Sequence, residues 1–399
     1  MLVVIARLLA RAAVQSTRIF YELGRQGPQL PAGPLVVVAN HPNSWMDALV
    51  IFCTAGRRVR PLARAPIFDR FVIGHVLRGL DGLPVYRPQD DPEQVHRNET
   101  TFDAAVAALG AGEAILVFPE GESHSDPGLA PLKTGAARIA LRAEEARGWN
   151  LGLQVVPVGL TYRRKTAFRG RAAAYVGEAF PVAPWRHAYE EDPAAAVRAL
   201  TDAIAEALER VTLILSDVED QALVDAAEAL YAAERGLSEP GEEALAARLP
   251  RLKLFEEGVN WLRAHDAERL SRLASAVASY RWRLLRLGIR EGELPESSPM
   301  HLEARRIGVQ VTLAVLEIPL ALLGLAAWYL PYASPRPLFW VYKPVYEARA
   351  TVKLVHALVA FPLTYALWLA LAWHTGGAAL AAFVVVLLPL AGLAALHWR

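Results

Sequence analysis

The sequence predicts an α/β domain, then an α-helical connector, then C-terminal membrane helices. Short β-rich runs alternate with helical stretches in the first half of the chain. Residues 190–290 are rich in Ala, Leu, Glu and Arg with helical periodicity, and long uncharged apolar segments follow residue 306. The predicted regions of the 399-residue chain are an amphipathic N-terminal helix at 1–29, the α/β domain at 30–185, the connector at 186–300 and the membrane helices at 301–399.

The overall composition excludes several classes of protein. The net charge is only +1, from 42 basic and 41 acidic residues. A chain that binds nucleic acid through charge would carry a basic excess, so we expect no nucleic-acid partner. An acidic disordered protein is also excluded, since 54% of the residues are hydrophobic. The single cysteine, Cys53, excludes an internal disulfide framework and a Cys-rich zinc site, and its apolar surroundings favour a core position.

The N-terminal stretch 1–23 has the pattern of an apolar helix along which Arg7, Arg11 and Arg18 recur. No clear small-residue cleavage site follows it, which argues against a signal peptide. A helix with an apolar face beside arginines can lie in the headgroup plane of a bilayer. An ordinary amphipathic helix packed on the neighbouring domain explains the pattern equally well.

Within residues 30–185, β-rich runs and helical stretches define the expected elements. The expected strands are Pro34–Ala39, Val59–Ala63, Leu83–Tyr86, Ala114–Phe118, Gln154–Thr161 and Ala172–Val176. The expected helices include Ser44–Phe52, Asn98–Leu109 and Thr134–Ala146.

The first candidate catalytic group lies in Asn40-His41-Pro42-Asn43-Ser44-Trp45-Met46-Asp47, directly after an expected strand. Open α/β sheets bind ligands at the carboxyl ends of their strands. Histidine titrates near neutral pH, so His41 can take a proton from an alcohol, and a carboxylate can orient its ring. On one continuous helix His41 and Asp47 would lie about 120° apart, so contact requires His41 in the turn before the helix. Pro42 favours such a turn.

Asp47 also has a purely structural interpretation. The stretch from Ser44 to Asp47 fits a capping box, in which an acidic side chain three residues after the N-cap bonds back to the N-cap amide. These residues alone leave both interpretations open.

A second group follows the strand expected at Ala114–Phe118 and reads Phe118-Pro119-Glu120-Gly121-Glu122-Ser123-His124. Proline and glycine bracket Glu120 in a tight turn, and Gly121 permits close backbone approach to a ligand. Lys133 precedes a helix N-terminus, where a cation is unfavourable unless an anion lies between them. An exposed loop lysine is the alternative.

Two arginines occupy similar positions after short strands. Arg64 follows the strand expected at Val59–Ala63, and Arg87 ends the stretch Gly82–Arg87. A guanidinium in such a place can bind a phosphate with two parallel hydrogen bonds. Each of them is also compatible with an ordinary surface arginine.

Three segments near the C-terminus are long and apolar enough to cross a bilayer, Gly308–Leu330, Leu354–Trp373 and Ala378–Leu396. Three spans are the simplest interpretation. One span cannot place both Arg305–Arg306 and the basic loop 331–353 in the cytoplasm. A re-entrant hairpin marked by Glu317 and Pro319 resolves this difficulty, and a buried helical bundle is a further alternative.

Taken in order, these motifs resemble those of the glycerolipid acyltransferase family. That family has an Asn-His stretch with a later Asp, an Arg after a short strand, Phe-Pro-Glu-Gly, and a Val-Pro-Val-like strand, here Val156–Val158. The match covers roughly residues 30–180. The resemblance implies an α/β acyltransferase domain with a mixed sheet flanked by helices.

Two departures from the common family pattern favour one branch. Five residues, not four, separate His41 from Asp47, and Glu122 and Ser123 stand where the common form has Thr and a phosphate-binding Arg. Both features, with Pro-Leu-Lys-Thr-Gly-Ala-Ala at Pro131–Ala137, are similar to the yeast-type glycerol-3-phosphate and dihydroxyacetone-phosphate acyltransferases. The resemblance therefore favours glycerol 3-phosphate as acceptor, with lysophosphatidate close behind.

The resemblance also implies roles for individual residues. His41 would be the general base and Asp47 its orienting carboxylate. The residues expected to bind substrate are Arg64, Arg87, Glu120, Gly121, Ser123 and Lys133. The donor would be acyl-CoA or acyl carrier protein, with no metal or other cofactor. We expect a membrane-lipid partner and a place in phospholipid biosynthesis at the cytoplasmic membrane, with the catalytic domain facing the cytoplasm.

Two other functions remain as alternatives. A metal-dependent hydrolase would use His41, Asp47, His124 and Asp126 as ligands, since imidazole and carboxylate both bind metals. A non-enzymatic lipid-binding protein would use the C-terminal apolar segments as its working part.

Overall fold

The computed structural model describes residues 2–87, 89–126, 128–213, 218–235, 237, 245–287 and 300–397. The chain divides into two compact units. The first contains Met1–Glu293 and Tyr346–Thr351, and the second contains Leu294–Val345 and Val352–Arg399.

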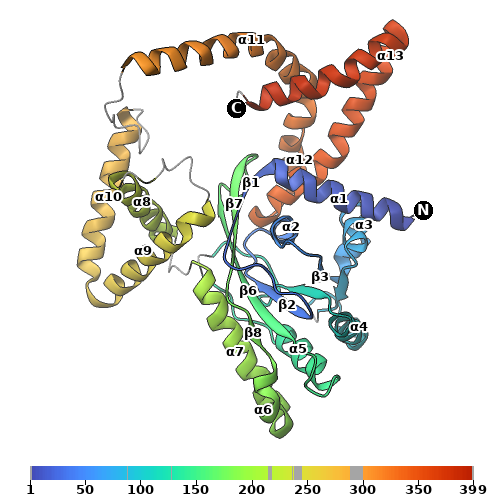
Figure 1. The fold of residues 1–399 in the computed structure, drawn as a ribbon, viewed down its shortest axis with the longest axis vertical. Helices are drawn as coiled ribbons and strands as arrows, with labels where there is room; N and C mark the ends of the chain where they lie inside the picture. The colour runs from blue at the N-terminus through green and yellow to red at the C-terminus, as the bar shows by residue number, and fades with distance from the viewer. Residues whose placement is uncertain are drawn as a thin grey trace. The chain divides into compact units, whose positions relative to one another are not determined.

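The first unit is built on an eight-stranded mixed sheet (Figure 1). The strands are β1 (Tyr21–Gln26), β2 (Leu35–Ala39), β3 (Val59–Arg64), β4 (Leu83–Val85), β5 (Ala114–Val117), β6 (Gln154–Arg163), β7 (Gly170–Val176) and β8 (Phe180–Pro181). Their order is β1-β7-β6-β2-β5-β3-β4, with β8 paired to β6. Strands β6, β2, β5, β3 and β4 run parallel, whereas β7 and β8 are antiparallel to β6. The mixed sheet flanked by helices that the sequence predicts is therefore confirmed.

The central strands are buried along their whole length. All residues of β2, Leu-Val-Val-Val-Ala, and of β5, Ala-Ile-Leu-Val, are buried, as expected for parallel strands covered on both faces. One apolar core joins these strands to α4 (Asn98–Gly110), α5 (Gly135–Glu145) and α7 (Pro193–Val211). The sheet edge that follows β2 and β5 is therefore held by a rigid core.

The N-terminal helix is shorter than the sequence predicts. Helix α1 (Leu2–Phe20) ends before Tyr21, and the next residues form β1, which pairs in parallel with β7. The β1 sequence, Tyr-Glu-Leu-Gly-Arg-Gln, has little strand signal of its own and is extended because a partner strand is available. Helix α3 (Phe71–Gly79), which the sequence does not predict, packs against α1.

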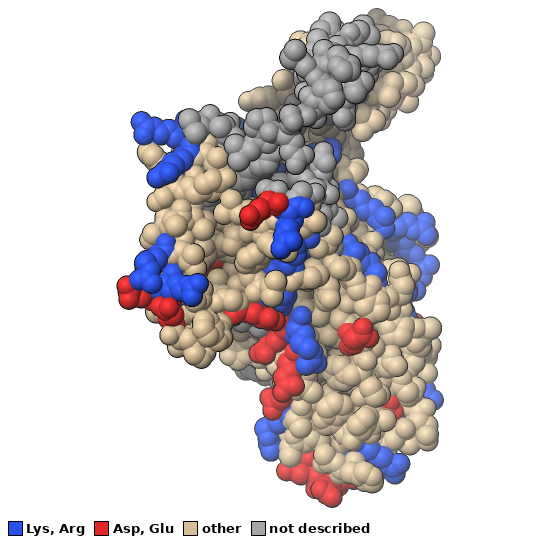
Figure 2. All heavy atoms as spheres, turned by 60° about the vertical axis from the view of Figure 1, so that its left-hand side comes forward, with Lys and Arg blue, Asp and Glu red and all other residues tan. Residues whose placement is uncertain are grey.

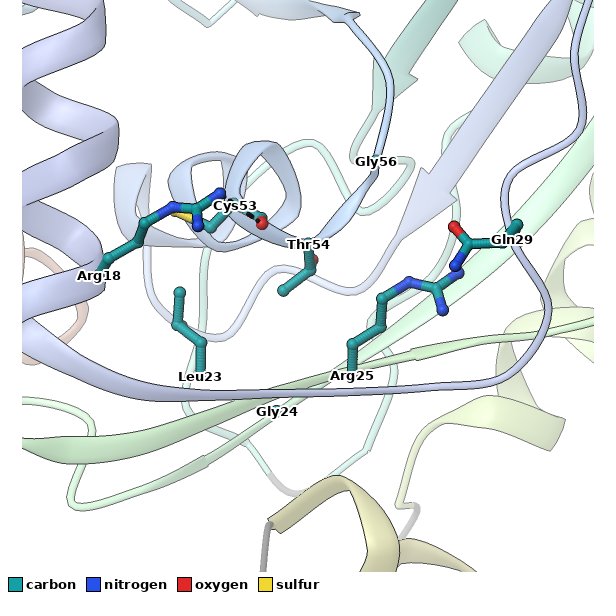
Figure 3. Close-up of a pocket in the computed structure, with 8 residues that line it drawn as sticks. All are labelled: Arg18, Leu23, Gly24, Arg25, Gln29, Cys53, Thr54 and Gly56. Carbon is teal, nitrogen blue, oxygen red and sulfur yellow. Dashed lines mark hydrogen bonds between the residues drawn. The ribbon is translucent and has the colours of Figure 1, made fainter.

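Helix α2 (Trp45–Thr54) follows β2 and packs against β1, β7 and α1. Near its C-terminal end, Cys53 is half-buried and its thiol donates to the Val14 carbonyl. Burial raises the pKa of this thiol to about 11. Figure 3 shows the adjoining cavity of about 470 Å³, where Arg18 donates to the Cys53 carbonyl over 3.1 Å. This arginine caps the C-terminal end of α2, which is the favourable position for a cation.

The connector is helical, as predicted. Its described helices are α6 (Arg186–Glu191), α7, α8 (Val218–Glu234), α9 (Leu245–His265) and α10 (Ala267–Leu287), of which α7 belongs to the core of the sheet. A second apolar cluster joins α8, α9 and α10, and the buried Glu228 is paired with Arg248 and Arg251. On the face shown in Figure 2, basic and acidic side chains are interspersed.

The second unit contains α11 (Met300–Ala333), α12 (Pro335–Tyr342) and most of α13 (Arg349–His397). Helix α13 is kinked at Gly377, which lies between the second and third predicted apolar segments. The α11 backbone at Gly324 approaches α13 so closely that a Cβ there would lie 1.9 Å from the Ala391 carbonyl oxygen. Among the described residues, the helix Tyr346–Leu396 is long and apolar enough to cross a membrane, by length and composition. The first predicted segment lies partly outside the described side chains.

Candidate active site

The candidate residues gather at one edge of the sheet. The carboxyl ends of parallel strands meet at the same edge, which is where open α/β sheets bind ligands. At this edge His41 follows β2, Glu120 follows β5, Arg64 ends β3 and Arg87 follows β4. The strand order therefore sets the Glu120 turn beside His41 and the two arginines beyond it.

His41 and Asp47 form a hydrogen-bonded pair. His41 lies in the turn before α2, and its Nδ1 is 2.9 Å from Asp47 Oδ2. Asp47 is fully buried and accepts two further hydrogen bonds, from the Asn43 backbone N–H at 2.7 Å and from the Tyr162 hydroxyl at 2.6 Å. A buried carboxylate is costly unless it is hydrogen-bonded in this way. Its three donors fix the carboxylate against the imidazole.

This arrangement differs from the capping box that the sequence also allows. Ser44, the N-cap of α2, makes no side-chain capping bond and has a φ of 50°, a left-handed conformation unusual for a residue with a Cβ. The Asp47 carboxylate accepts the Asn43 amide, one residue before the N-cap. Asp47 therefore accepts hydrogen bonds from the His41 ring and from the turn at Asn43, and it does not cap the helix at Ser44.

The geometry assigns the tautomer of His41. Because Nδ1 faces a carboxylate, it carries the proton, and Nε2 presents its lone pair. No described residue forms a hydrogen bond with Nε2. The ring stacks on Phe118 with a centroid distance of 4.1 Å and an interplanar angle of 14°, and the side chain is 18% exposed. A base in this state can accept a proton from a hydroxyl at its open face.

Glu120 ties the two central loops together. Its side chain is buried, and Oε1 accepts the His41 backbone N–H at 2.7 Å. Oε2 accepts the Ala130 backbone N–H at 2.8 Å and pairs with His124 Nε2. Both carboxylate oxygens are therefore engaged within the protein, which makes Glu120 an organiser of the site.

The turn after Glu120 requires glycine. Gly121 has a φ of +79°, and a Cβ there would lie 3.3 Å from Cγ of Lys133. The Lys133 backbone N–H donates to the Pro119 carbonyl at 2.7 Å, and Arg87 donates to the Gly121 carbonyl at 2.7 Å. Lys133 is exposed and forms no ion pair with any described residue. Ser123 is half-buried and forms no side-chain hydrogen bond within the described part of the chain.

Arg64 and Arg87 share one carboxylate that sequence reasoning missed. Both guanidiniums bind Asp90 in a bidentate manner. The hydrogen bonds from Arg87, then those from Arg64, hold the pKa of Asp90 well below its usual range. Because two guanidiniums share one carboxylate, the cluster of Arg64, Arg87 and Asp90, at this corner of the site, has a net positive charge.

Sequence reasoning also missed Lys165, which follows β6 on the other side of His41. Its ammonium donates to the Pro42 carbonyl at 2.7 Å and to the Ser125 hydroxyl at 2.8 Å. Burial lowers the pKa of Lys165. Its backbone carbonyl accepts the Tyr21 hydroxyl, which in turn accepts Asn43 Nδ2 at 2.9 Å. The rule that places polar residues after an apolar strand would have found Lys165 and Tyr162.

The four residues considered as metal ligands do not converge. His124 Nδ1 lies 3.7 Å from the exposed Asp126, whereas His41 pairs with Asp47. Within the described ranges, no group of three or more His, Cys, Asp or Glu side chains could hold a metal ion.

Comparison with known proteins shows what the region around His41 and Glu120 is similar to. Residues 24–161 match the family model described as Acyltransferase. Glycerol-3-phosphate O-acyltransferase 2 of Saccharomyces cerevisiae is 27% identical over 288 residues, covering 67% of this chain and 37% of that protein. An uncharacterized acyltransferase of Schizosaccharomyces pombe is 29% identical over 367 residues, covering 70% and 52%. Glycerol-3-phosphate O-acyltransferase 1 of S. cerevisiae is 32% identical over 126 residues, covering 31% and 16%.

The chain thus spans about half or less of the length of these relatives. Among solved structures, the 1-acyl-sn-glycerophosphate acyltransferase PlsC of Thermotoga maritima is 19% identical, with a TM-score of 0.35, over 51% of this chain and 80% of that one. The resemblance to glycerolipid acyltransferases that the motifs indicate is confirmed by the family model and the yeast relatives.

Proposed function

We propose, from the premise that residues 24–161 form an acyltransferase-family domain, that this protein is a membrane-bound O-acyltransferase of phospholipid biosynthesis. It moves a fatty acyl group from acyl-CoA or acyl carrier protein to a hydroxyl of glycerol 3-phosphate or 1-acylglycerol 3-phosphate. The observation that carries the proposal is the His41–Asp47 pair, in which Nε2 is the open base.

The proposed reaction is a direct transfer. Nε2 of His41 takes the proton of the acceptor hydroxyl while the oxygen of that hydroxyl attacks the carbonyl carbon of the thioester. The C–S bond then breaks, and the leaving thiolate takes the proton back from the imidazolium. Asp47 stabilises that imidazolium through Nδ1–H. Backbone N–H groups near the Glu120 turn stabilise the oxyanion.

We assign the acceptor phosphate to the side of the site that carries Arg64, Arg87 and Lys133. The two guanidiniums share Asp90, so they retain a net positive charge, and Lys133 has no ion-pair partner among the described residues. Guanidiniums match the geometry of phosphate oxygens. Gly121 and Ser123 line the turn between this corner and His41, where we expect the glycerol backbone to bind.

Glycerol 3-phosphate is the favoured acceptor. Two of the yeast relatives are named glycerol-3-phosphate O-acyltransferases, and the departures at Glu122 and Ser123 are similar to that branch. Lysophosphatidate, which shares the phosphate and one free hydroxyl, is the second candidate.

Two apolar features support membrane attachment, and we further propose that the catalytic domain faces the cytoplasm. The first is the apolar helix Tyr346–Leu396. The second is α1, whose buried residues are small apart from Phe20 and which exposes large apolar residues. Its buried stripe is Ala6, Ala10, Ala13, Thr17 and Phe20. Its exposed apolar residues are Leu2, Val3, Val4, Ile5, Leu8 and Ile19. Arginines flank this outer face, as in helices that lie in the headgroup region.

The test is an acyl-transfer assay with the purified full chain. The acceptors are glycerol 3-phosphate, dihydroxyacetone phosphate, lysophosphatidate and an unphosphorylated lysolipid, each with acyl-CoA and with acyl carrier protein as donor. We expect transfer to a phosphorylated acceptor, loss of transfer in His41→Ala, and retention in His96→Ala, an exposed control. Transfer that survives His41→Ala would overturn the mechanism. Chelator-sensitive hydrolysis would favour the metal-dependent alternative, and lipid binding without any turnover the non-enzymatic one.

A further inference from the structure

The segment Tyr346–Thr351 belongs to the same compact unit as the catalytic sheet. Within it, the Glu347 carboxylate accepts the hydroxyl of Ser125. Ser125 follows His124, whose imidazole pairs with the organising Glu120. A residue more than two hundred positions along the chain therefore reaches the loop that follows β5.

Lys165 also contacts Ser125, and we call the group Ser125, Glu347 and Lys165 the junction. Its ammonium donates to Ser125 Oγ and to the Pro42 carbonyl, and it lies 4.9 Å from the centre of the Tyr346 ring. It thus contacts the loop after β2, the loop after β5 and the segment that contains Glu347. Half-buried ammonium groups are expensive unless anions, carbonyls or aromatic faces surround them. Here a carbonyl and an aromatic ring contact the ammonium, and the carboxylate of Glu347 attracts it electrostatically.

The junction is linked to His41 by hydrogen bonds to the backbone of His41 and Pro42. The Pro42 carbonyl, one residue after His41, is held by Lys165. The His41 carbonyl accepts the His124 backbone N–H at 3.3 Å, and the His41 N–H donates to Glu120. Displacement of either loop would therefore move the imidazole relative to a bound acceptor.

We propose that Lys165 and Glu347 are positioning residues that act as one unit on His41. Lys165 fixes the turn that carries His41, and Glu347 keeps Ser125 and the ammonium in place. The inference rests on the proposed acyl transfer. On this proposal, the segment Tyr346–Thr351, from which α13 begins, helps to position the catalytic residues.

A double-mutant cycle tests this proposal on the full chain. The variants are Lys165→Met, Glu347→Gln and the double variant, with Lys165→Arg as the charge-conserving change. Arg186→Met and Glu190→Gln, from an exposed ion pair on α6, provide the matched control. The readouts are kcat and KM for the acceptor, the thermal midpoint, and amide hydrogen exchange of the peptide covering residues 40–47.

We expect each single variant to lower kcat about 10- to 100-fold with the acceptor KM little changed, because only the orientation of the base is lost. The double variant should be no slower than the slower single variant, since both disrupt one unit. Hydrogen exchange of residues 40–47 should rise in both single variants, whereas Lys165→Arg should keep most of the activity. The control pair should change none of these readouts.

Three results would overturn the proposal. Fully additive losses would show that the residues act separately. A rise in acceptor KM at unchanged kcat for Lys165→Met would make Lys165 a phosphate ligand instead. Unchanged exchange of residues 40–47 in both variants would remove the positioning role. Exchange is measured without substrate, so the outcome is independent of whether wild type transfers an acyl group. A wild type without transfer contradicts only the proposed function.

Discussion

The Tyr162 hydroxyl donates to Asp47 Oδ1 over 2.6 Å, so the carboxylate that orients His41 is itself held from the neighbouring strand β6. Tyr162 is half-buried, and desolvation of the phenol followed by the nearby Asp47 charge raises its pKa well above the ordinary value. The phenol therefore remains a donor across the whole physiological pH range.

Tyr162→Phe removes this donor while keeping the ring. One oxygen of a buried carboxylate is then unsatisfied, which costs about 1–3 kcal/mol or more for a charged group. We expect kcat to fall about tenfold or more, with the acceptor KM nearly constant, because orientation of the base is lost rather than substrate binding. Steady-state kinetics at saturating donor measures this. Tyr175→Phe, on β7 and outside the site, is the control, and equal kcat values in the two variants would contradict the role.

The main catalytic pair could be predicted from sequence because its members lie close together in the chain. His41 and Asp47 are six residues apart, and a strand, a turn and a helix start suffice to join them. Tyr162 and Lys165 could not be joined to them in this way, since they lie 115 residues from Asp47 and 123 from Pro42. Their contacts depend on β6 lying beside β2, which is a property of the sheet order.

The elements that sequence reasoning missed have the same cause. Strand β1 forms because β7 offers backbone partners, and α3 forms a short helix packed on α1. The role of Asp90 could not be predicted, because its two ion pairs depend on the pairing of β3 with β4, which brings Arg64 and Arg87 together. The local sequence pattern predicts most strands and where they end. Strand β1, helix α3 and the ion pairs of Asp90 depend instead on contacts between segments that are distant in the chain.

Arg87→Met is expected to weaken recognition of the acceptor phosphate. The guanidinium lies beside Asp90 and the Gly121 carbonyl, at the corner where we assign the phosphate. Loss of a charge-assisted contact is worth about 1.5–3 kcal/mol, or roughly 10- to 100-fold. The ratio of kcat/KM for a phosphorylated acceptor to that for an unphosphorylated lysolipid should fall by this factor. Arg60→Met, whose guanidinium pairs with Glu113, is the control. An unchanged ratio would remove Arg87 from phosphate binding.

Asp90→Asn should reveal a pH-dependent contribution to stability. The folded-state pKa of Asp90 is depressed by the two guanidiniums, while the unfolded value is about 3.9. Its contribution is therefore fully present well above pH 4 and is lost as the pH falls through the folded-state pKa. The difference in free energy of unfolding between wild type and Asp90→Asn should be constant from about pH 7 to 5 and shrink below about pH 4. Chemical denaturation in detergent measures it. Asp202→Asn, an exposed control on α7, should show no such trend.

Cys53→Ala should leave acyl transfer unchanged. The raised pKa of about 11 keeps Cys53 a neutral thiol near pH 7, and the thiolate is the nucleophilic form. The residue also lies near the C-terminal end of α2, whereas Asp47 lies in the first turn of that helix. We expect kcat and KM within about twofold of wild type, and alkylation by iodoacetamide that becomes fast only near pH 11. Loss of transfer at an unchanged thermal midpoint would give Cys53 a role that the direct mechanism lacks.

The outer face of α1 should contact lipid in the full chain. Its exposed residues include Ile5 and Leu8, while Arg7 and Arg11 lie beside them one turn apart. Apolar side chains of this size favour the acyl region by about 25 cal/mol per Å² of surface removed from water, and the arginines favour anionic headgroups. In a Cys53→Ala background, a fluorescent label on Leu8→Cys should be quenched by a lipid-attached quencher in anionic vesicles. The same label on Asp202→Cys should not be quenched. Equal quenching at both positions would mean that α1 is an ordinary packed helix, and membrane attachment would then depend on the apolar helix Tyr346–Leu396 alone.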